Sequence, residues 1–335
     1  MKALRYLNSN SECSCTFLAV LYFFKASSGS MYSVGFAVVT NSIEQPAWVK
    51  YFMYLPTCRD SGSLFGGAAI DTKRILSMSI VKLIYNQLRY SEFFPFYLKI
   101  FRPQIYVGYL KELNFYKAIL PSPTLVFDVG ANVGDKTALF ASLGHNVVAV
   151  EPDRENFRLL KRRFARTKSI NIEGVAVGDS PDTRLFYVNE GGSPANTLSV
   201  KWKKILEDAS MNRWAKALPF AESYAVAVIT LDQLIRSFGK PFYIKIDVEG
   251  YEEHVFKGLT TAVNVISFEA NFPEFRHETV ACVSIFNQLV ERSAFNAVNQ
   301  DFSFFFSDHL DFNAMVEWLT KTDLKYFEVF CFKIA

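Results

Sequence analysis

Residues 128–135 are D-V-G-A-N-V-G-D, and they follow a short apolar run of β-forming residues, Thr124 to Phe127. A helical pattern begins directly behind them, from Thr137 to Leu143, and ends at Gly144. A strand, a glycine turn and a helix in this order are typical of a cofactor-binding loop. The glycines let the backbone approach the ligand, and the helix start presents free N–H groups to it. The stretch therefore predicts an α/β domain with a cofactor loop after its first strand.

Strands and helices alternate along most of the chain that follows. Further strands are expected at residues 146–150, 170–177, 184–188, 225–229, 242–246 and 263–268, and helices at 154–164, 231–238, 252–259 and 279–291. Three late strands, at 295–298, 302–306 and 326–332, surround a helix at 310–319. This alternation predicts a mostly parallel sheet covered by helices on both faces, with an antiparallel edge formed by the late strands.

The residues of the loop indicate which kind of cofactor it binds. Gly130 and Gly134 stand where a tight turn is needed, and Asn132 lies between them. Asp128 and Asp135 would repel a phosphate, so they suit a cofactor with a cationic amino-acid head better. The dinucleotide fingerprint G-x-G-x-x-G would need glycines at positions 132 and 135, and both are absent.

Two further acidic residues end strands beyond the loop. Glu151 ends the second strand, where an acid binds ribose hydroxyls; a simple charge at a helix N-terminus is the alternative interpretation. Asp179 ends the third strand in A-V-G-D and is predicted to hydrogen-bond the adenine amino group, with a turn aspartate that contacts no ligand as the alternative.

The densest polar cluster is K-I-D-V-E-G-Y-E, residues 245–252, at the end of a strand expected to be buried. Strand alternation places Lys245, Asp247 and Glu249 on one side. Burying three charges together is costly unless they pair or bind something, and such groups mark functional sites. Glu269 ends the next strand and is expected to project into the same crevice. The alternative interpretation of the 245–252 cluster is a capped helix start with a structural ion pair.

The order and spacing of these blocks resemble the FkbM-type methyltransferases. The motifs are D-V-G-A-N-V-G-D, V-V-A-V-E-P, A-V-G-D, T-L-D-Q-L and K-I-D-V-E-G-Y-E, within residues 125–269. The resemblance implies a class I methyltransferase (Rossmann-like) fold with a mostly parallel seven-stranded sheet. It also implies S-adenosylmethionine as cofactor and methylation of a hydroxyl oxygen.

The predicted reaction is in-line attack of an acceptor hydroxyl on the cofactor methyl group. Asp247 or Glu249 is the expected base, and Lys245 orients or stabilises charge. The acceptor is expected to be a small molecule or carbohydrate, and no metal ligand is assigned, although Asp247, Glu249 and Glu269 would suit a hard cation. Two rival functions stay open: an NAD-dependent oxidoreductase, and a non-catalytic binding protein that keeps the fold.

Composition bounds the remaining properties. A net charge of only +3 in 335 residues gives no case for nucleic acid binding. The five scattered cysteines lack zinc or disulfide spacing, which favours reduced thiols in the cytoplasm.

The beginning of the chain stands apart from the rest. Residues 1–85 are predicted to be an N-terminal extension, irregular and then helical over 73–90, before a methyltransferase domain at 86–335. Its apolar stretches are too short to span a bilayer, so a membrane role is not expected, but secretion or membrane association of this part stays an open alternative. The sequence predicts no oligomeric state.

Overall fold

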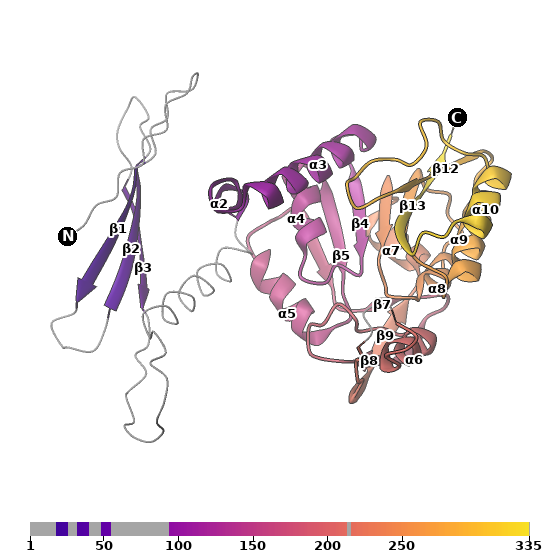
Figure 1. Cartoon of the computed structure of the whole chain (residues 1–335), viewed down its shortest axis with the longest axis horizontal. Helices are drawn as coiled ribbons and strands as arrows, with labels where there is room; N and C mark the ends of the chain where they lie inside the picture. The colour runs from indigo at the N-terminus through magenta and orange to yellow at the C-terminus, as the bar shows by residue number, and fades with distance from the viewer. Residues whose placement is uncertain (1–17, 26–31, 40–47, 55–93, 213–215, 335) are drawn as a thin grey trace. The chain divides into compact units, whose positions relative to one another are not determined.

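The computed structural model describes residues 18–25, 32–39, 48–54, 94–212 and 216–334 (Figure 1). The chain divides into two compact units, Met1–Arg74 and Ile75–Ala335, which are treated separately. Two predictions lie outside the described residues: the helix over residues 73–90 and the domain boundary at residue 85.

The first unit contains an antiparallel sheet of three strands, β1 (Leu18–Lys25), β2 (Tyr32–Val39) and β3 (Trp48–Tyr54), in the order β1-β2-β3. This sheet was not predicted, because these segments show no sustained alternation of apolar and polar residues. Their richness in Val, Phe and Tyr is nevertheless typical of strands.

The second unit is built on a seven-stranded sheet with the order β12-β13-β11-β10-β4-β5-β6. Five neighbouring strands are parallel: β6 (Ile170–Glu173), β5 (Asn146–Val150), β4 (Leu125–Val129), β10 (Tyr243–Ile246) and β11 (Val265–Asn271). The antiparallel strand is β13 (Tyr326–Lys333), which lies between β11 and β12 (Ser293–Val298). The predicted seven-stranded class I methyltransferase architecture is confirmed, with its antiparallel strand one position inside the edge.

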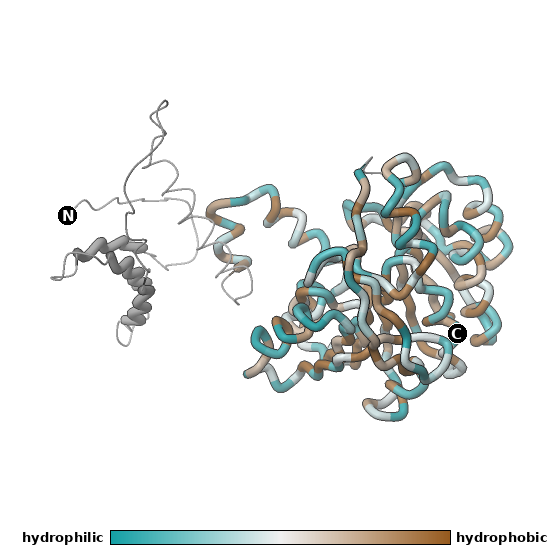
Figure 2. The backbone as a smooth tube through the Cα atoms, turned by 90° about the horizontal axis from the view of Figure 1, so that it is seen from below, coloured by the Kyte–Doolittle hydropathy of each residue, from teal (hydrophilic) through white to brown (hydrophobic). Residues whose placement is uncertain are grey.

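Helices cover both faces of this sheet (Figure 1). One core contains residues of α3 (Pro103–Ile119), α4 (Asp135–Ser142) and α5 (Arg154–Arg163). The other contains residues of α7 (Leu231–Phe238), α8 (Glu252–Lys257), α9 (Arg276–Leu289) and α10 (Phe312–Lys321). Neighbours in a strand face opposite cores: Val126 packs in the first and Phe127 in the second. Figure 2 shows apolar and polar residues alternating along the outer helices, as an amphipathic helix on a sheet requires. Another helix of this unit, α2 (Phe94–Phe101), precedes α3.

A smaller sheet of three strands, in the order β7-β9-β8, accompanies the large one. It consists of β7 (Ala176–Val177), β8 (Asp182–Val188) and β9 (Glu222–Ile229), and α6 (Val200–Glu207) lies between β8 and β9 in sequence. The single strand predicted over 170–177 is therefore wrong, since β6 ends at Glu173 and β7 pairs with β9 instead. Gly174 lies at the break, where a Cβ atom would come within 2.9 Å of the Phe157 ring.

The predicted strand at 302–306 is also wrong. Only Phe304 forms an isolated bridge there, to Val298. The backbone of Phe302 is left-handed, with φ of 56°, and the Asn299 side chain accepts hydrogen bonds from the N–H groups of Asp301 and Ser303. A turn fixed in this way cannot extend a sheet ladder.

No helix among the described residues has the length and apolarity needed to cross a bilayer. Cys282 and Cys331 are free and buried, and the other three cysteines lie outside the described residues.

Candidate active site

The loop after β4 is held by glycine geometry. Gly130 has φ of 82°, and a Cβ atom there would lie 1.8 Å from the backbone oxygen of Asp247. Gly134 also has φ of 82° and is closely packed against Leu160 and Phe164. Both positions need a residue without a side chain, because the left-handed backbone and the close contacts leave no room for one. This geometry brings the β4 loop against the end of β10.

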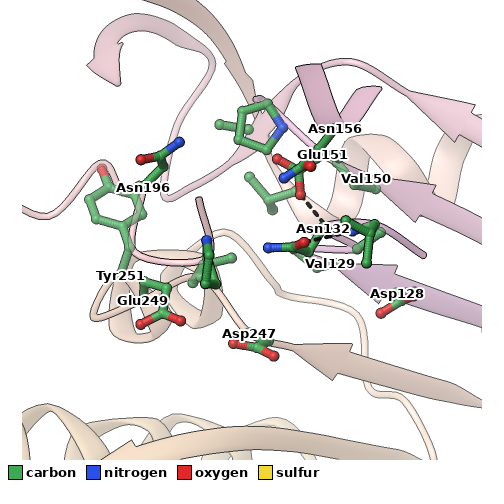
Figure 3. A pocket seen from close by; sticks show the side chains of 18 of the residues that line it. Asp128, Val129, Asn132, Val150, Glu151, Asn156, Asn196, Asp247, Glu249 and Tyr251 are labelled. Carbon is green, nitrogen blue, oxygen red and sulfur yellow. Dashed lines mark hydrogen bonds between the residues drawn. The ribbon is translucent and has the colours of Figure 1, made fainter. Parts of the chain in front are cut away.

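A cavity of about 600 Å³ opens at the carboxyl ends of β4, β5 and β10, and we call it the first cavity (Figure 3). Ligands of parallel α/β sheets bind at this edge. The first cavity is lined by loop residues 128–133, 135 and 136, by residues 150–152 and 156, by the segment 175–177, by parts of 186–198, and by the β10 loop. Figure 3 shows Glu249 and Tyr251 on one side of it and Asn132, Glu151 and Asp128 on the other.

Asp128 is fully buried at the end of β4. One carboxylate oxygen, Oδ2, accepts a hydrogen bond of 2.5 Å from the Thr137 hydroxyl, and Oδ1 has no hydrogen-bond partner among the described residues. Burial raises the pKa of Asp128, although the charge of Lys245 and the Thr137 hydrogen bond act to lower it. An unpartnered buried carboxylate oxygen beside a cavity suits a cationic ligand group.

Glu151 is held in place by two backbone N–H groups. Its Oε2 accepts a 2.7 Å hydrogen bond from Asn132 N, and its Oε1 accepts one of 2.8 Å from Asp153 N (Figure 3). Burial raises the pKa of Glu151 to about 8, although these hydrogen bonds favour its charged form. Asn132 therefore links the glycine loop to this acid, and both line the first cavity.

Asp135 and Asp179 were also predicted to bind the cofactor, and in the structure each contacts basic side chains. Asp135 begins α4, is half-exposed and forms an ion pair of 2.8 Å with Arg163, although it lines the first cavity. Asp179 is not among the residues that line the cavity. Its carboxylate contacts Arg184 at 2.6 Å and His254 at 3.3 Å. The contact of Asp179 with adenine stays a prediction. The hydrogen bonds of its carboxylate to Arg184 and His254 do not favour it.

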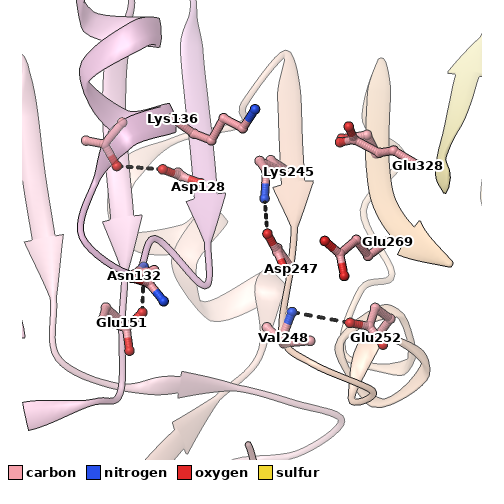
Figure 4. Close-up of polar contacts among 12 residues, drawn as sticks. Asp128, Asn132, Lys136, Glu151, Lys245, Asp247, Val248, Glu252, Glu269 and Glu328 are labelled. Atoms are coloured by element: carbon pink, nitrogen blue, oxygen red, sulfur yellow. Dashed lines mark hydrogen bonds and ion pairs between the residues drawn. The ribbon is translucent and has the colours of Figure 1, made fainter. Parts of the chain in front are cut away.

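Buried Lys245 and partly exposed Asp247 form an ion pair at the end of β10 (Figure 4). Lys245 Nζ lies 2.7 Å from Asp247 Oδ2. Burial alone would lower the pKa of Lys245, but the charges of Asp247, Asp128 and Glu328 raise it above its ordinary value. Lys245 is therefore a fixed cation beside the Asp247 carboxylate.

A smaller cavity of about 310 Å³, the second cavity, shares four side chains with the first: Lys136, Lys245, Asp247 and Glu269. The Tyr326 hydroxyl donates a hydrogen bond to Glu269. Burial, followed by the charge of Asp247, raises the pKa of Glu269 to about 8. The two cavities therefore meet at one group of charged side chains.

Asp247, Glu249 and Glu269 each offer a carboxylate oxygen within 4.8 Å of the others. Oxygen ligands at this spacing suit a hard divalent cation. The predicted convergence of these three acids is found in the structure, while their use by a metal stays an alternative. Methyl-transfer assays with and without EDTA distinguish the two.

Several residues of the site carry no signal in the sequence pattern. Lys136, Tyr326 and Glu328 reach the second cavity from α4 and β13, and Asn156 and Asn196 reach the first from α5 and the loop after β8. Lys136 and Asn156 look like ordinary positions on amphipathic helices, and Tyr326 and Glu328 like an alternating strand. Only the fold brings them to the site.

Comparison with known proteins identifies the family. The model of the methyltransferase FkbM domain matches residues 128–322. The chain belongs to this family. The family uses S-adenosylmethionine as its methyl donor.

A curated relative, the hexuronic acid methyltransferase AglP of Haloferax volcanii, is 28% identical over 146 residues, which are 43% of this chain and 53% of the relative. The chain thus matches about half the length of this relative.

Solved methyltransferases are more distant. The precorrin-6y C5,15-methyltransferase of Geobacter metallireducens is 9% identical with a TM-score of 0.34, over 67% of this chain and 88% of that one. The plantazolicin methyltransferase BpumL in complex with SAH is 10% identical with a TM-score of 0.34, over 80% and 92%.

The residues of the first cavity fit the cofactor of the family. The orphaned oxygen of Asp128 suits the cationic amino-acid part, and Glu151 suits the ribose hydroxyls. When bound, S-adenosylmethionine supplies an electrophilic methyl group. The protein then has to position an acceptor, exclude water and take up a proton.

Proposed function

We propose that this chain methylates a hydroxyl oxygen of a small molecule or sugar. The observation that supports this most directly is the position of the Lys245–Asp247 pair, which lines both cavities. A group in the second cavity thus faces the same charged side chains that border the cofactor side. The printed activity of the curated relative, which acts on hexuronic acid, adds support for a sugar acceptor.

The roles of the side chains follow from their charges. Asp247 is the proposed base: it would accept the hydroxyl proton when the acceptor oxygen takes the methyl group from the cofactor sulfur, which would leave as the neutral thioether. Lys245, 2.7 Å away, holds this carboxylate in place. Glu269, whose pKa burial raises to about 8, already accepts the Tyr326 hydrogen bond and is not the proposed base. Glu249 lines the first cavity only and is the second candidate for proton transfer.

Proton removal is needed because an alcohol is a weak nucleophile at neutral pH. A positioned base contributes roughly 10²–10⁴-fold to such a reaction. Orienting the acceptor and excluding water supply a further part of the acceleration.

The test is a screen of acceptors with the purified full chain and methyl-labelled cofactor. Sugars, polyols and hydroxylated metabolites are compared with amine and thiol acceptors. We expect label in an O-methyl ether, identified by mass and by the methoxy signal in NMR. Transfer only to nitrogen or sulfur would contradict the proposal, and so would cofactor binding with no transfer to any hydroxyl acceptor.

A further inference from the structure

The second cavity has the composition of a carbohydrate subsite. Gln300 supplies an amide group that donates and accepts hydrogen bonds, and Asn299 supplies an amide N–H2 donor, since its oxygen already accepts from Asp301 and Ser303. Phe302 and Tyr326 supply aromatic rings. At about 310 Å³ it has room for one sugar ring or a similar polyol. Polar groups that pair with hydroxyls and rings that cover apolar C–H faces favour a polyhydroxyl ligand.

The cations of this cavity are already engaged. Lys245 pairs with Asp247. Lys136 pairs with Glu112 of α3, and its ammonium lies 4.9 Å from the centre of the Phe302 ring. Burial lowers the pKa of Lys136 to about 8, and its ion pair with Glu112 already uses its charge.

Three acids face the same space. Figure 4 shows the carboxyl groups of Asp247, directly after β10, Glu269 on β11 and Glu328 on β13 directed toward one region. Glu328 is half-buried, and the hydroxyl of Ser267 donates a 2.6 Å hydrogen bond to its Oε1. A carboxylate brought into this cavity would be desolvated beside acids and would find both lysines occupied.

We infer that the second cavity, bounded by Asp247, Glu269 and Glu328, binds the acceptor and selects an uncharged sugar or polyol over one that carries a carboxylate. The inference rests on the proposed function and narrows it. It also separates this chain from the printed substrate class of its curated relative, whose name specifies hexuronic acid. The carboxylates of Asp247 and Glu328 repel an anionic ligand, and the two lysines of the cavity are already paired with acids.

The experiment compares matched pairs of acceptors that differ only in the oxidation of one carbon. Glucosides and glucuronides with the same aglycone, and galactosides and galacturonides with the same aglycone, serve as the pairs. We expect kcat/KM to be at least about tenfold higher for the neutral member, since an unpaired charge in a partly buried site is strongly disfavoured.

A charge-removing variant tests the cause of this preference. Glu328→Gln keeps an oxygen that accepts the Ser267 hydrogen bond but removes the negative charge. We expect the preference for the neutral acceptor to fall several-fold, through faster turnover of the acidic member. Glu291→Gln, an exposed glutamate after α9, is the matched control and leaves the preference unchanged.

The outcomes separate the two levels of the proposal. Equal rates on both members, or a preference for the acidic member, would overturn the charge inference while leaving O-methylation intact. An unchanged preference in Glu328→Gln would also overturn it. If no member of any pair is methylated while another class of acceptor is, the sugar proposal itself fails and the inference falls with it.

Discussion

The two cavities are adjacent and share four side chains, but they are built in different ways. The first is shaped by backbone: left-handed glycines, N–H groups that hold Glu151, and a loop between two consecutive strands. The second is shaped by side chains from α4, β10, β11, β13 and residues 298–302. We therefore expect ligand binding in the first cavity, the proposed cofactor side, to be weakened by any atom added to its backbone. We expect ligand binding in the second cavity, the proposed acceptor side, to change with the charge of its side chains.

Gly130→Ala has the largest expected effect. The added Cβ would lie 1.8 Å from the Asp247 oxygen, so the loop or the end of β10 must move. A left-handed alanine costs about 1–2 kcal/mol by itself, and the collision adds to it. We expect a clearly lower melting temperature and cofactor binding weakened by about 100-fold or more, because Asn132 and Glu151 lose their alignment. Calorimetric titration and thermal melts measure both.

Gly108→Ala is the matched control for this variant. Gly108 lies within α3. A Cβ atom added there would have no heavy atom within 4 Å apart from its chain neighbours and the helix's own backbone. Alanine is favoured over glycine inside a helix by about 1 kcal/mol, so stability should be equal or higher. Near-normal cofactor binding by Gly130→Ala would show that backbone contact does not shape the first cavity.

Asp247→Asn should abolish most turnover with less effect on cofactor binding. If Asp247 is the base, kcat falls roughly 10²–10⁴-fold. Lys245 loses its partner in this variant, so the melting temperature has to be measured alongside, because an unpaired buried charge is destabilising. Single-turnover assays with saturating cofactor give the rate. Full activity in a folded variant would exclude Asp247 as the base and leave Glu249 to be tested in the same way.

The two cavities also differ in how far the sequence predicts them. The loop at 128–135, Glu151 and the 245–252 cluster each belong to a contiguous motif that follows a strand, so their convergence follows from a parallel α/β sheet. Lys136 lies on α4, and Tyr326 and Glu328 lie on the antiparallel strand β13, so these three residues share no motif. Strand β7 was not separated from β6 because a two-residue strand leaves no periodicity, and the strand predicted at 302–306 was wrong because Asn299 fixes a turn.

Glu269→Gln tests the burial of charge between the two cavities. The unfolded chain releases this proton near pH 4.5, the ordinary value, whereas the folded protein holds it until about pH 8. Between these values the folded state binds more protons, so this group makes stability fall as pH rises. The neighbouring charges are those of Asp247, Lys245 and Glu252, and the hydrogen-bond partner is Tyr326.

Glutamine does not titrate and still accepts the Tyr326 hydrogen bond. We therefore expect the melting temperature of Glu269→Gln, relative to the wild type, to rise from pH 5 to pH 8. Comparing the two proteins at each pH removes the contributions of Glu151 and Glu252, whose pKa values burial also raises, to about 8 and about 7. A constant difference across this range would mean that Glu269 is not held in its protonated form.

Asp179→Asn has the smallest expected effect. The Asp179 carboxylate is about a third exposed and is engaged with Arg184 and His254 outside the first cavity. An exposed ion pair of this kind contributes about 0–1 kcal/mol. We expect the dissociation constant of the cofactor to change by less than about threefold, against about tenfold or more for Glu151→Gln, whose carboxyl oxygens border the cavity and accept two backbone hydrogen bonds. If Asp179→Asn weakened binding more than Glu151→Gln, the adenine contact predicted from the sequence would be correct. In that case Arg184 must release the carboxylate when the cofactor binds, and the cofactor side would depend on side-chain charge as the acceptor side does.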